Sequence, residues 1–260
     1  MFSKWGIEAS AIAILMPGNQ AILLIGSKKL DDVCHEGLGA AVAAVVNEAG
    51  GQGIKLLEAL PEPGDRFRST VLKRAGFRYL SNLHYLRRDS ARGTTLSARS
   101  DLEWTEYSDR CREAFLQTLE RTLSQSLDFP ELNGIRSSEE ALQGYAAVGR
   151  HEPGLWWLAS VAKEPAGILL QSEIDECGTI ELVYCGVTQP FRRTGVADAL
   201  VRRAVHQTGQ IGARTMALGV DERNAPAHRL YRRWGFVPFA IRAAWIATPH
   251  KIETSEFSGY

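Results

Sequence analysis

The sequence lacks three features that would point to a class of partner. Its charge has no excess of either sign, because 30 lysines and arginines balance 30 aspartates and glutamates. A neutral chain gives no overall attraction to nucleic acid. Its 4 cysteines include no CxxC pair, which argues against a metal or redox motif and fits a reducing cytoplasm. The N-terminal apolar run Ala9–Met16 is too short to span a membrane and lacks a cleavage pattern. We therefore expect a cytoplasmic protein without metal, nucleic-acid or membrane partners.

Two common phosphate-binding signatures are also missing, since the chain has neither Gly-x-Gly-x-x-Gly nor a Walker loop ending in Gly-Lys-Ser/Thr. A different strand–loop–helix pattern is present around residues 179–200. Ile180–Val187 is apolar and β-branched, and from Val196 the apolar spacing changes from two to 3.6. The loop between them contains Arg192-x-x-Gly195-x-Ala197. A glycine turn before a helix N-terminus directs free N–H groups at one point, which suits a phosphate.

A second pattern follows the predicted strand Thr215–Val220. Asn224 is a typical N-cap residue, and Gly235 is typical of the position just beyond a helix. Asn224 and Tyr231 are seven residues apart, or two helical turns, so they are expected near one face of that helix.

The two halves of the chain end alike. The first half ends with a predicted strand at 53–60, a helix, Ala75-Gly76-Phe77 and a strand at 80–86. The second half ends with the same series: a strand at Thr215–Val220, a helix, Trp234-Gly235-Phe236 and a strand at 239–246. This favours an internal duplication over coincidence. After Ile25, however, the first half has no Arg-x-x-Gly-x-Ala loop. We predict a first domain over 1–92, a polar linker over 93–101, a second domain over 102–249 and a loose tail over 250–260.

Together, the motifs of the second half resemble the GNAT superfamily of acyl-CoA-dependent N-acyltransferases. The strand with Val187 and the loop that follows it resemble the acyl-CoA-binding motif. The next motif is matched by Asn224, Ala227, Leu230-Tyr231 and Gly235-Phe236. The resemblance covers about residues 102–247, and residues 5–90 resemble a shortened, degenerate copy. It implies an α/β (α+β) GNAT fold: a mixed, mostly antiparallel sheet with flanking helices, in two tandem copies. Arg193 departs from the family, which often has glycine there.

The resemblance also implies roles for individual residues. The backbones of Cys185 and Val187 would pair with the pantetheine arm of acetyl-CoA, and Asn224 would hydrogen-bond that arm. Tyr231 would protonate the departing thiolate of CoA. The pyrophosphate would be held by the backbone amides of Arg192, Arg193, Thr194, Gly195, Val196 and Ala197.

Two assignments stay open. Glu181 lies in an apolar strand, where burial would raise its pKa and suit it as general base. It could equally sit at the exposed start of the strand, and another base could act through water. Strict alternation would place Glu181, Val183, Cys185 and Val187 on one face of the strand. Cys185 could be a nucleophile, but a small core residue is favoured because no histidine lies nearby in sequence.

The sequence therefore predicts an N-acetyltransferase that moves an acetyl group from acetyl-CoA to a primary amine in a ternary complex. The alternative is a non-catalytic tandem protein that senses acyl-CoA or acts as a scaffold. The acceptor cannot be identified from the sequence, although the two helices within 108–148 and their loop are expected on its side of the site.

Overall fold

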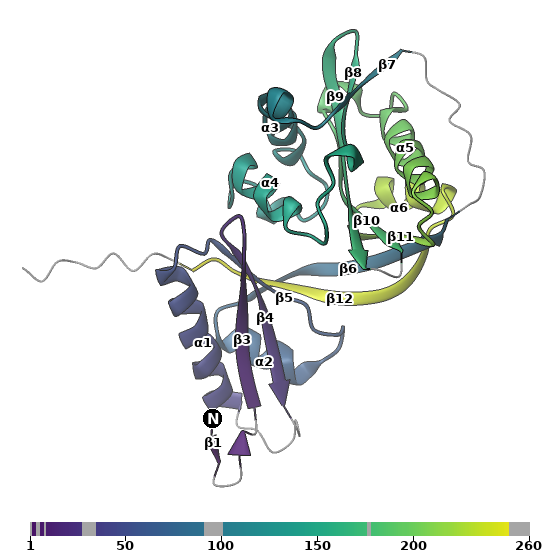
Figure 1. Cartoon of the computed structure of the whole chain (residues 1–260). Coiled ribbons are helices and arrows are strands. Elements are labelled where there is room, and N and C mark those ends of the chain that lie inside the picture. The colour runs from purple at the N-terminus through teal and green to yellow at the C-terminus, as the bar shows by residue number, and fades with distance from the viewer. Residues whose placement is uncertain are drawn as a thin grey trace, which may run out of the picture. The chain divides into compact units, whose positions relative to one another are not determined.

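A computed structural model describes residues 2–3, 6–7, 9–27, 35–90, 101–175 and 178–249 (Figure 1). Its contacts divide the chain into two compact units. The first comprises Met1–Leu80 with Ala243–Tyr260, and the second comprises Ser81–Arg242. Several predictions fall outside the described residues: most of the linker, the tail, and two of the four cysteines, Cys34 and Cys177.

The first unit is a small sheet with two helices. Strands β3 (Ala9–Met16) and β4 (Gln20–Ser27) form a hairpin, and α1 (His35–Gly51) leads to β5 (Leu56–Ala59), which runs parallel to β4. Helix α2 (Arg66–Arg74) follows. Residues of α1, α2 and the strands share one apolar core. A separate short pair consists of β1 (Phe2–Ser3) and β2 (Gly6–Ile7).

The second unit is built on a larger sheet whose neighbouring strands run in the order β7-β8-β9-β10-β11-β6. All neighbours are antiparallel except β10 and β11, which are parallel. The strands are β6 (Arg78–Asp89), β7 (Leu102–Glu106), β8 (Trp156–Val161), β9 (Glu164–Asp175), β10 (Thr179–Val187), β11 (Thr215–Asp221) and β12 (Val237–Ala247). The helices are α3 (Arg112–Leu123), α4 (Ser138–Ala146), α5 (Val196–Gln210) and α6 (Ala225–Arg233).

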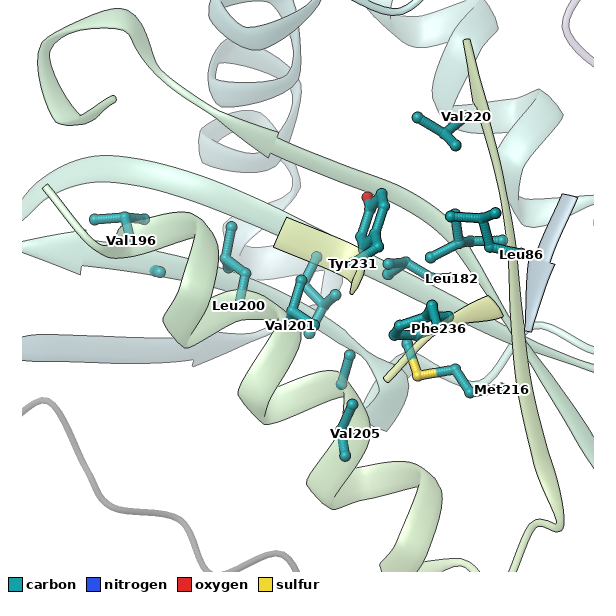
Figure 2. Packing of buried hydrophobic residues seen from close by; sticks show 14 of the residues in the cluster. Leu86, Leu182, Val196, Leu200, Val201, Val205, Met216, Val220, Tyr231 and Phe236 are labelled. Carbon is teal, nitrogen blue, oxygen red and sulfur yellow. The ribbon is translucent and has the colours of Figure 1, made fainter. Parts of the chain in front are cut away.

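Helices flank this sheet on both faces because successive strand residues point to opposite sides. Along β9, Ile168 and Leu170 join the core that contains α3 and α4 residues. Leu169, between them, joins the core that contains α5 residues and Tyr231 of α6 (Figure 2). The predicted mixed, mostly antiparallel sheet with flanking helices is therefore confirmed.

The ends of α2 and α6 have matching hydrogen bonds. Both helices have 9 residues and an N-cap side chain, Asp65 or Asn224, that accepts from the N–H three residues on. Both stop at a glycine in the left-handed region, Gly76 at φ 86° and Gly235 at φ 77°. The following phenylalanine N–H then bonds a carbonyl of the last turn, Leu72 in α2 and Tyr231 in α6. The Ala-Gly-Phe and Trp-Gly-Phe signals correctly predicted both helix ends.

Each compact unit contains a strand segment from the other half of the sequence. In the second unit, β6 pairs antiparallel with β11. Leu83 lies opposite Asp221 at one end of this pairing, and Asp89 lies opposite Thr215 at the other. In the first unit, Trp245–Ala247 of β12 pair with Leu57–Ala59 of β5. The sequence boundary near residue 92 therefore lies beyond β6, whereas contacts divide the chain inside β6 and β12. The sequence missed β7, and it predicted β6 only over residues 80–86, so that both ends of this strand were missed.

Candidate functional site

The second unit has an opening in its sheet between β10 and β11. Strand β10 stays paired with β9 as far as Val187, opposite Gly167. It pairs with β11 only over Thr179–Glu181, opposite Thr215–Ala217. From Leu182 to Val187, the edge of β10 that faces β11 is therefore unpaired with it. An extended ligand can add to such an edge through main-chain hydrogen bonds. The predicted pantetheine residues, Cys185 and Val187, lie on this stretch.

A β-bulge in β10 changes which side chains share a face. The register with β9 shifts between Leu182 and Tyr184, so Val183 is an extra residue. Cys185 and Val187 consequently pack in the α5-side core with Leu182, whereas Val183 and Tyr184 pack in the α3-side core. The prediction that Val183 shares a face with Cys185 and Val187 was wrong, because alternation does not continue through a bulge.

The loop after β10 leaves backbone donors free at the start of α5. Gly195 is the N-cap of α5 with φ 92°, and Arg193 has φ 63°. Within the described part of the chain, no acceptor is found for the N–H groups of Arg193, Gly195, Val196 and Ala197. These donors and the helix dipole favour an anion at this point. The sequence prediction located this loop and its glycine turn correctly.

The two loop arginines differ in what their side chains do. The Arg192 guanidinium donates to the carbonyls of Val187 at 3.3 Å and Gln125 at 2.7 Å. It thereby ties the end of β10 to the segment after α3. Arg193 is exposed, and no hydrogen bond or ion pair of its side chain is found among the described residues. Of the two, Arg193 has the guanidinium available to an anion.

Asn224 and Tyr231 lie on α6, as predicted, but Asn224 already has partners. Its Oδ1 accepts from the Ala227 N–H at 3.2 Å, and its Nδ2 donates to Asp128 Oδ1 at 3.0 Å. Tyr231 is 7% exposed, and its ring meets Phe236 at 5.6 Å in an edge-on arrangement. The phenol oxygen points away from Phe236 and Met216 (Figure 2). No hydrogen-bond partner for it is found among the described residues.

Burial keeps Tyr231 and Cys185 protonated. Desolvation raises the pKa of Tyr231 well above its ordinary value, and the nearby Cys185, Asp128 and Tyr184 add to this. Desolvation and the charge of Asp128 raise the pKa of the Cys185 thiol to about 12. A phenol of this kind can only donate a proton at neutral pH. A thiol of this kind is a poor nucleophile, because the thiolate is the reactive form.

Glu181 lies where β10 and β11 are still paired, opposite Ala217 of β11 and Ser172 of β9. It is half-buried, and desolvation raises the pKa of its carboxyl. It therefore has the environment expected of a general base, at the closed end of the opening.

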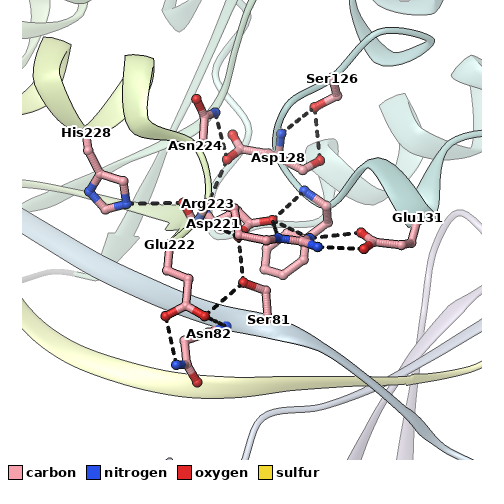
Figure 3. A network of polar contacts seen from close by, with 11 residues as sticks. Ser81, Asn82, Ser126, Asp128, Glu131, Asp221, Glu222, Arg223, Asn224 and His228 are labelled. Atoms are coloured by element: carbon pink, nitrogen blue, oxygen red, sulfur yellow. Dashed lines mark hydrogen bonds and ion pairs between the residues drawn. The ribbon is translucent and has the colours of Figure 1, made fainter.

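Sequence reasoning missed a polar network at the end of β11 (Figure 3). Asp221 is fully buried, and its carboxylate accepts from Ser81 Oγ at 2.7 Å, from the Phe129 N–H at 3.0 Å and from Arg223. Arg223 also binds both oxygens of Glu131, at 2.6 and 2.9 Å. The network fixes the α3–α4 loop against β11. Its only sequence signal was a run of charged residues directly after a strand.

Two negative findings concern the described part of the chain. No group of three or more His, Cys, Asp or Glu side chains there could hold a metal ion. None of the helices there is long and apolar enough to cross a membrane.

Comparison with known proteins agrees with this geometry. Residues 112–236 match the Acetyltransferase (GNAT) family. No curated protein sequence matches the chain. Among solved structures, a GCN5-related N-acetyltransferase from Sphaerobacter thermophilus has a TM-score of 0.64 at 17% identity, with 94% of this chain and 78% of that chain covered. One from Kribbella flavida has a TM-score of 0.57 at 15% identity, covering 91% and 89%.

A third similar structure is a tandem GNAT protein from the clavulanic acid biosynthesis pathway. It has a TM-score of 0.58 at 13% identity, and 95% of this chain and 80% of that chain are covered. At these identities the similarity shows the fold alone. The fold is therefore GNAT-like, and the family's sequence pattern covers the stretch that contains the opening, the loop and Tyr231.

Proposed function

We propose that this protein is an N-acetyltransferase that moves an acetyl group from acetyl-CoA to a primary amine. The observation that carries the proposal is the opening between β10 and β11, with a free anion-binding loop at one end and Tyr231 beside it. The match of residues 112–236 to the Acetyltransferase (GNAT) family supports the same activity.

In this proposal, acetyl-CoA lies along the unpaired edge of β10. The pantetheine amides pair with the backbones of Cys185 and Val187, in place of the β11 strand that has separated there. The pyrophosphate sits on the free N–H groups of Arg193, Gly195, Val196 and Ala197, and the exposed Arg193 adds positive charge. The N–H groups of Arg192 and Thr194, which the sequence analysis included, already donate to the carbonyls of Gln189 and Phe191. Asn224 donates to the pantetheine arm through Nδ2, which requires that group to share or leave its bond to Asp128.

The chemistry needs a base and an acid on opposite sides of the thioester. Glu181 takes a proton from the amine, and the neutral nitrogen attacks the thioester carbonyl to form a tetrahedral intermediate. The C–S bond then breaks, and Tyr231 gives its proton to the sulfur of CoA. The raised pKa of Tyr231 keeps the phenol protonated until a thiolate forms beside it. Backbone N–H groups of β10 beyond the bulge polarise the carbonyl oxygen.

The first half is, in the same proposal, a degenerate second copy of the fold. Two features support this: each half has a pair of parallel strands, and the helix that follows has the same kind of ends. Gln20 of β4 lies opposite Leu56 of β5, as Thr179 of β10 lies opposite Thr215 of β11. By this correspondence Leu72 takes the place of Tyr231, and Asp65 takes that of Asn224. A leucine cannot donate a proton, so only the second copy would be catalytic.

The test is acetyl-CoA-dependent release of CoA over a panel of primary amines, with Tyr231→Phe beside the wild type. Loss of the acid should lower turnover about 100-fold or more, while acetyl-CoA affinity changes little. Tyr79→Phe, on β6 in the first unit, removes the same hydroxyl elsewhere and serves as control. Equal turnover in wild type and Tyr231→Phe would remove the acid role. Tight acetyl-CoA binding without transfer to any amine would instead favour the acyl-CoA sensor.

A further inference from the structure

Helices cover only part of one face of the second unit's sheet. The apolar core that contains α3 and α4 residues takes its strand residues from β8, β9 and β10. Among the residues that the structure describes, none from β6, β11 or β12 belongs to that core. Helices α3 and α4 therefore cover the part of this face that β8, β9 and β10 form.

Strand pairing aligns three residues on the same face, next to the covered part. Met216 of β11 and Leu86 of β6 pack in the core on the α5 side. Since neighbours along a strand point to opposite sides, Ala217 and Arg87 point to the α3 side. Ala217 lies opposite Arg87 of β6 and also opposite Glu181 of β10. Arg87, Ala217 and Glu181 therefore form one row across three strands, with only a methyl group in the middle.

The row and its neighbour leave the backbone of β11 uncovered by large side chains. Neighbouring strands lie about 4.8 Å apart, so the Cα atoms of Glu181 and Arg87 are separated by about 10 Å. In the next row toward the opening, Tyr85 lies opposite Gly219, which is exposed and has no side chain. A slim, extended molecule can thus lie across β11 between Glu181 and Arg87.

An exposed apolar strip on β12 borders the Arg87 end of this row. Val237, Phe239 and Ile241 alternate along the strand and are 55%, 48% and 39% exposed. The ring centroids of Phe239 and Tyr85 are 6.1 Å apart, and the Arg87 guanidinium carbon lies 5.5 Å from the Phe239 centroid. These contacts place Phe239 on the same face as the row. A positive charge is therefore held beside exposed apolar surface, which suits a ligand with an apolar part next to a negative charge.

The two ends of the row differ in charge. Glu181 is a half-buried acid next to the opening, which begins at Leu182. Arg87 is exposed, and no ion pair joins it to Asp89 or to another carboxylate among the described residues. An arginine binds a carboxylate through two parallel N–H donors. A ligand that spans the row would therefore place a carboxylate at Arg87 and its reacting amine at Glu181.

We propose that the acceptor lies across this row, so that the substrate class is a primary amine joined through an apolar spacer to a carboxylate. This proposal rests on the proposed function and names the acceptor of that same site. Arg87 binds the carboxylate, Phe239 contacts the spacer, and Glu181 receives the proton of the amine. A second ammonium group would meet the Arg87 cation, so polyamines are disfavoured. The first half of the sequence contributes to the site through β6.

The transfer leaves the carboxylate of the acceptor unchanged. The ammonium gives one proton to Glu181, and the neutral nitrogen forms the C–N bond. When the C–S bond breaks, nitrogen loses a second proton and sulfur gains one from Tyr231. One proton per turnover is released to solvent overall, and no further reactant is needed.

The length of the spacer tests the geometry. In extended ε-aminocaproate the nitrogen and the carboxyl carbon are about 7–8 Å apart, at roughly 3.8 Å for every three bonds. Together with the reach of the two side chains, this length spans two strand spacings of about 4.8 Å each. Glycine is too short to span them, because its amine and carboxyl carbon are only two bonds apart. Hexylamine has the same six carbons as ε-aminocaproate without the carboxylate, and it is the matched control ligand.

Two variants of the row and one of the strip separate charge from apolar contact. Arg87→Gln removes the charge from an exposed side chain, and Arg87→Lys keeps the charge without the paired donors. Phe239→Ala removes the apolar contact. Arg66→Gln makes the same change at the exposed start of α2, in the first unit, and serves as the control.

The experiment measures CoA release, and calorimetric binding to the CoA-loaded protein, with ε-aminocaproate, hexylamine and glycine. In the wild type, kcat/KM should be about 10-fold or more higher for ε-aminocaproate than for either of the other amines. Arg87→Gln should lower kcat/KM for ε-aminocaproate to that for hexylamine, and Arg87→Lys should keep part of the preference. Phe239→Ala should lower kcat/KM for both longer amines about 5-fold. Arg66→Gln should match the wild type.

The outcomes separate this proposal from the proposed function. Binding of ε-aminocaproate that depends on Arg87, without acetylation, supports the acceptor site and overturns the enzyme. Acetylation of hexylamine as efficient as that of ε-aminocaproate overturns the substrate class and leaves the enzyme intact. A preference for ε-aminocaproate that survives in a folded Arg87→Gln variant overturns the role of Arg87. A wild type that neither binds nor acetylates ε-aminocaproate overturns the substrate class, whatever the result with hexylamine.

Discussion

At the scale of single residues, Arg193 combines an unfavourable backbone with a useful charge. Its φ of 63° lies in the left-handed region, which costs a residue with a Cβ roughly 1–2 kcal/mol. The next residue but one, Gly195, is also left-handed. Two such residues turn the chain sharply into α5 and leave its first N–H groups free. Arg193 keeps a cation at this turn where the related family often has glycine.

This conformation predicts how substitutions at 193 affect stability. Arg193→Val should be less stable than Arg193→Gly by about 1–2 kcal/mol, because only glycine adopts positive φ without strain. At Arg192, where φ is −65°, valine should be at least as stable as glycine. Thermal unfolding of the four variants measures both differences. A preference for valine at 193 would mean that the turn does not have this geometry in solution.

The residues that sequence reasoning found are those with local signals. Asn224 and Tyr231 are placed by an N-cap, a two-turn spacing and a C-terminal glycine, all within one helix. Asp128 was out of reach, because its partners Asn224 and Asp221 are 96 and 93 residues away in sequence. The bulge at Val183 was also invisible, since both registers bury apolar side chains.

At the scale of elements, the site depends on how the α3–α4 loop is attached to β11. Asp221 provides this attachment through hydrogen bonds to Ser81, the Phe129 N–H and Arg223. Burial alone would raise the pKa of Asp221, but these hydrogen bonds outweigh it and hold the pKa below its ordinary value. The ionised carboxylate thus stabilises the fold and, with it, the position of Asp128.

Asp221→Asn should reduce the free energy of unfolding by about 2–3 kcal/mol at pH 7. A carboxyl with a lowered pKa stabilises the folded state above its unfolded pKa of about 4, and this stabilisation is lost as the pH falls. The stability difference between wild type and Asp221→Asn should therefore shrink between pH 5 and pH 2. Chemical denaturation across this range measures it, and a difference independent of pH would contradict the assigned ionisation.

At the scale of the whole molecule, chain order and compact units do not coincide. The duplication was read from repeated strand–helix–strand signals, which are local. No local signal shows that β6 pairs with β11 and β12 with β5, because the sequence of a strand says little about which strand it pairs with. The apolar residues of β6 and β12 would fit a neighbouring strand from either half of the sequence equally well. Domain boundaries at 92 and 102 were therefore drawn where the composition changes, after β6 rather than inside it.

This arrangement predicts that the second half does not fold without β6. A chain covering residues 102–260 leaves β11 without its antiparallel partner and should be insoluble or unfold without cooperativity. Full-length protein cut at a protease site engineered between residues 93 and 101 should keep both fragments together on gel filtration. A monomeric, cooperatively folding 102–260 fragment would show that β6 is dispensable.

The central claim is that acetyl-CoA binds with its pyrophosphate at the start of α5, and calorimetric titration of acetyl-CoA tests it most directly. Wild type should bind one acetyl-CoA per chain. Ala197→Glu should weaken binding about 30-fold or more through like charge, although a glutamate in the first turn of a helix favours folding. Ala44→Glu, at an exposed position of α1 in the first unit, should bind as the wild type does. Equal affinity in Ala197→Glu, or no binding to wild type, would contradict the account.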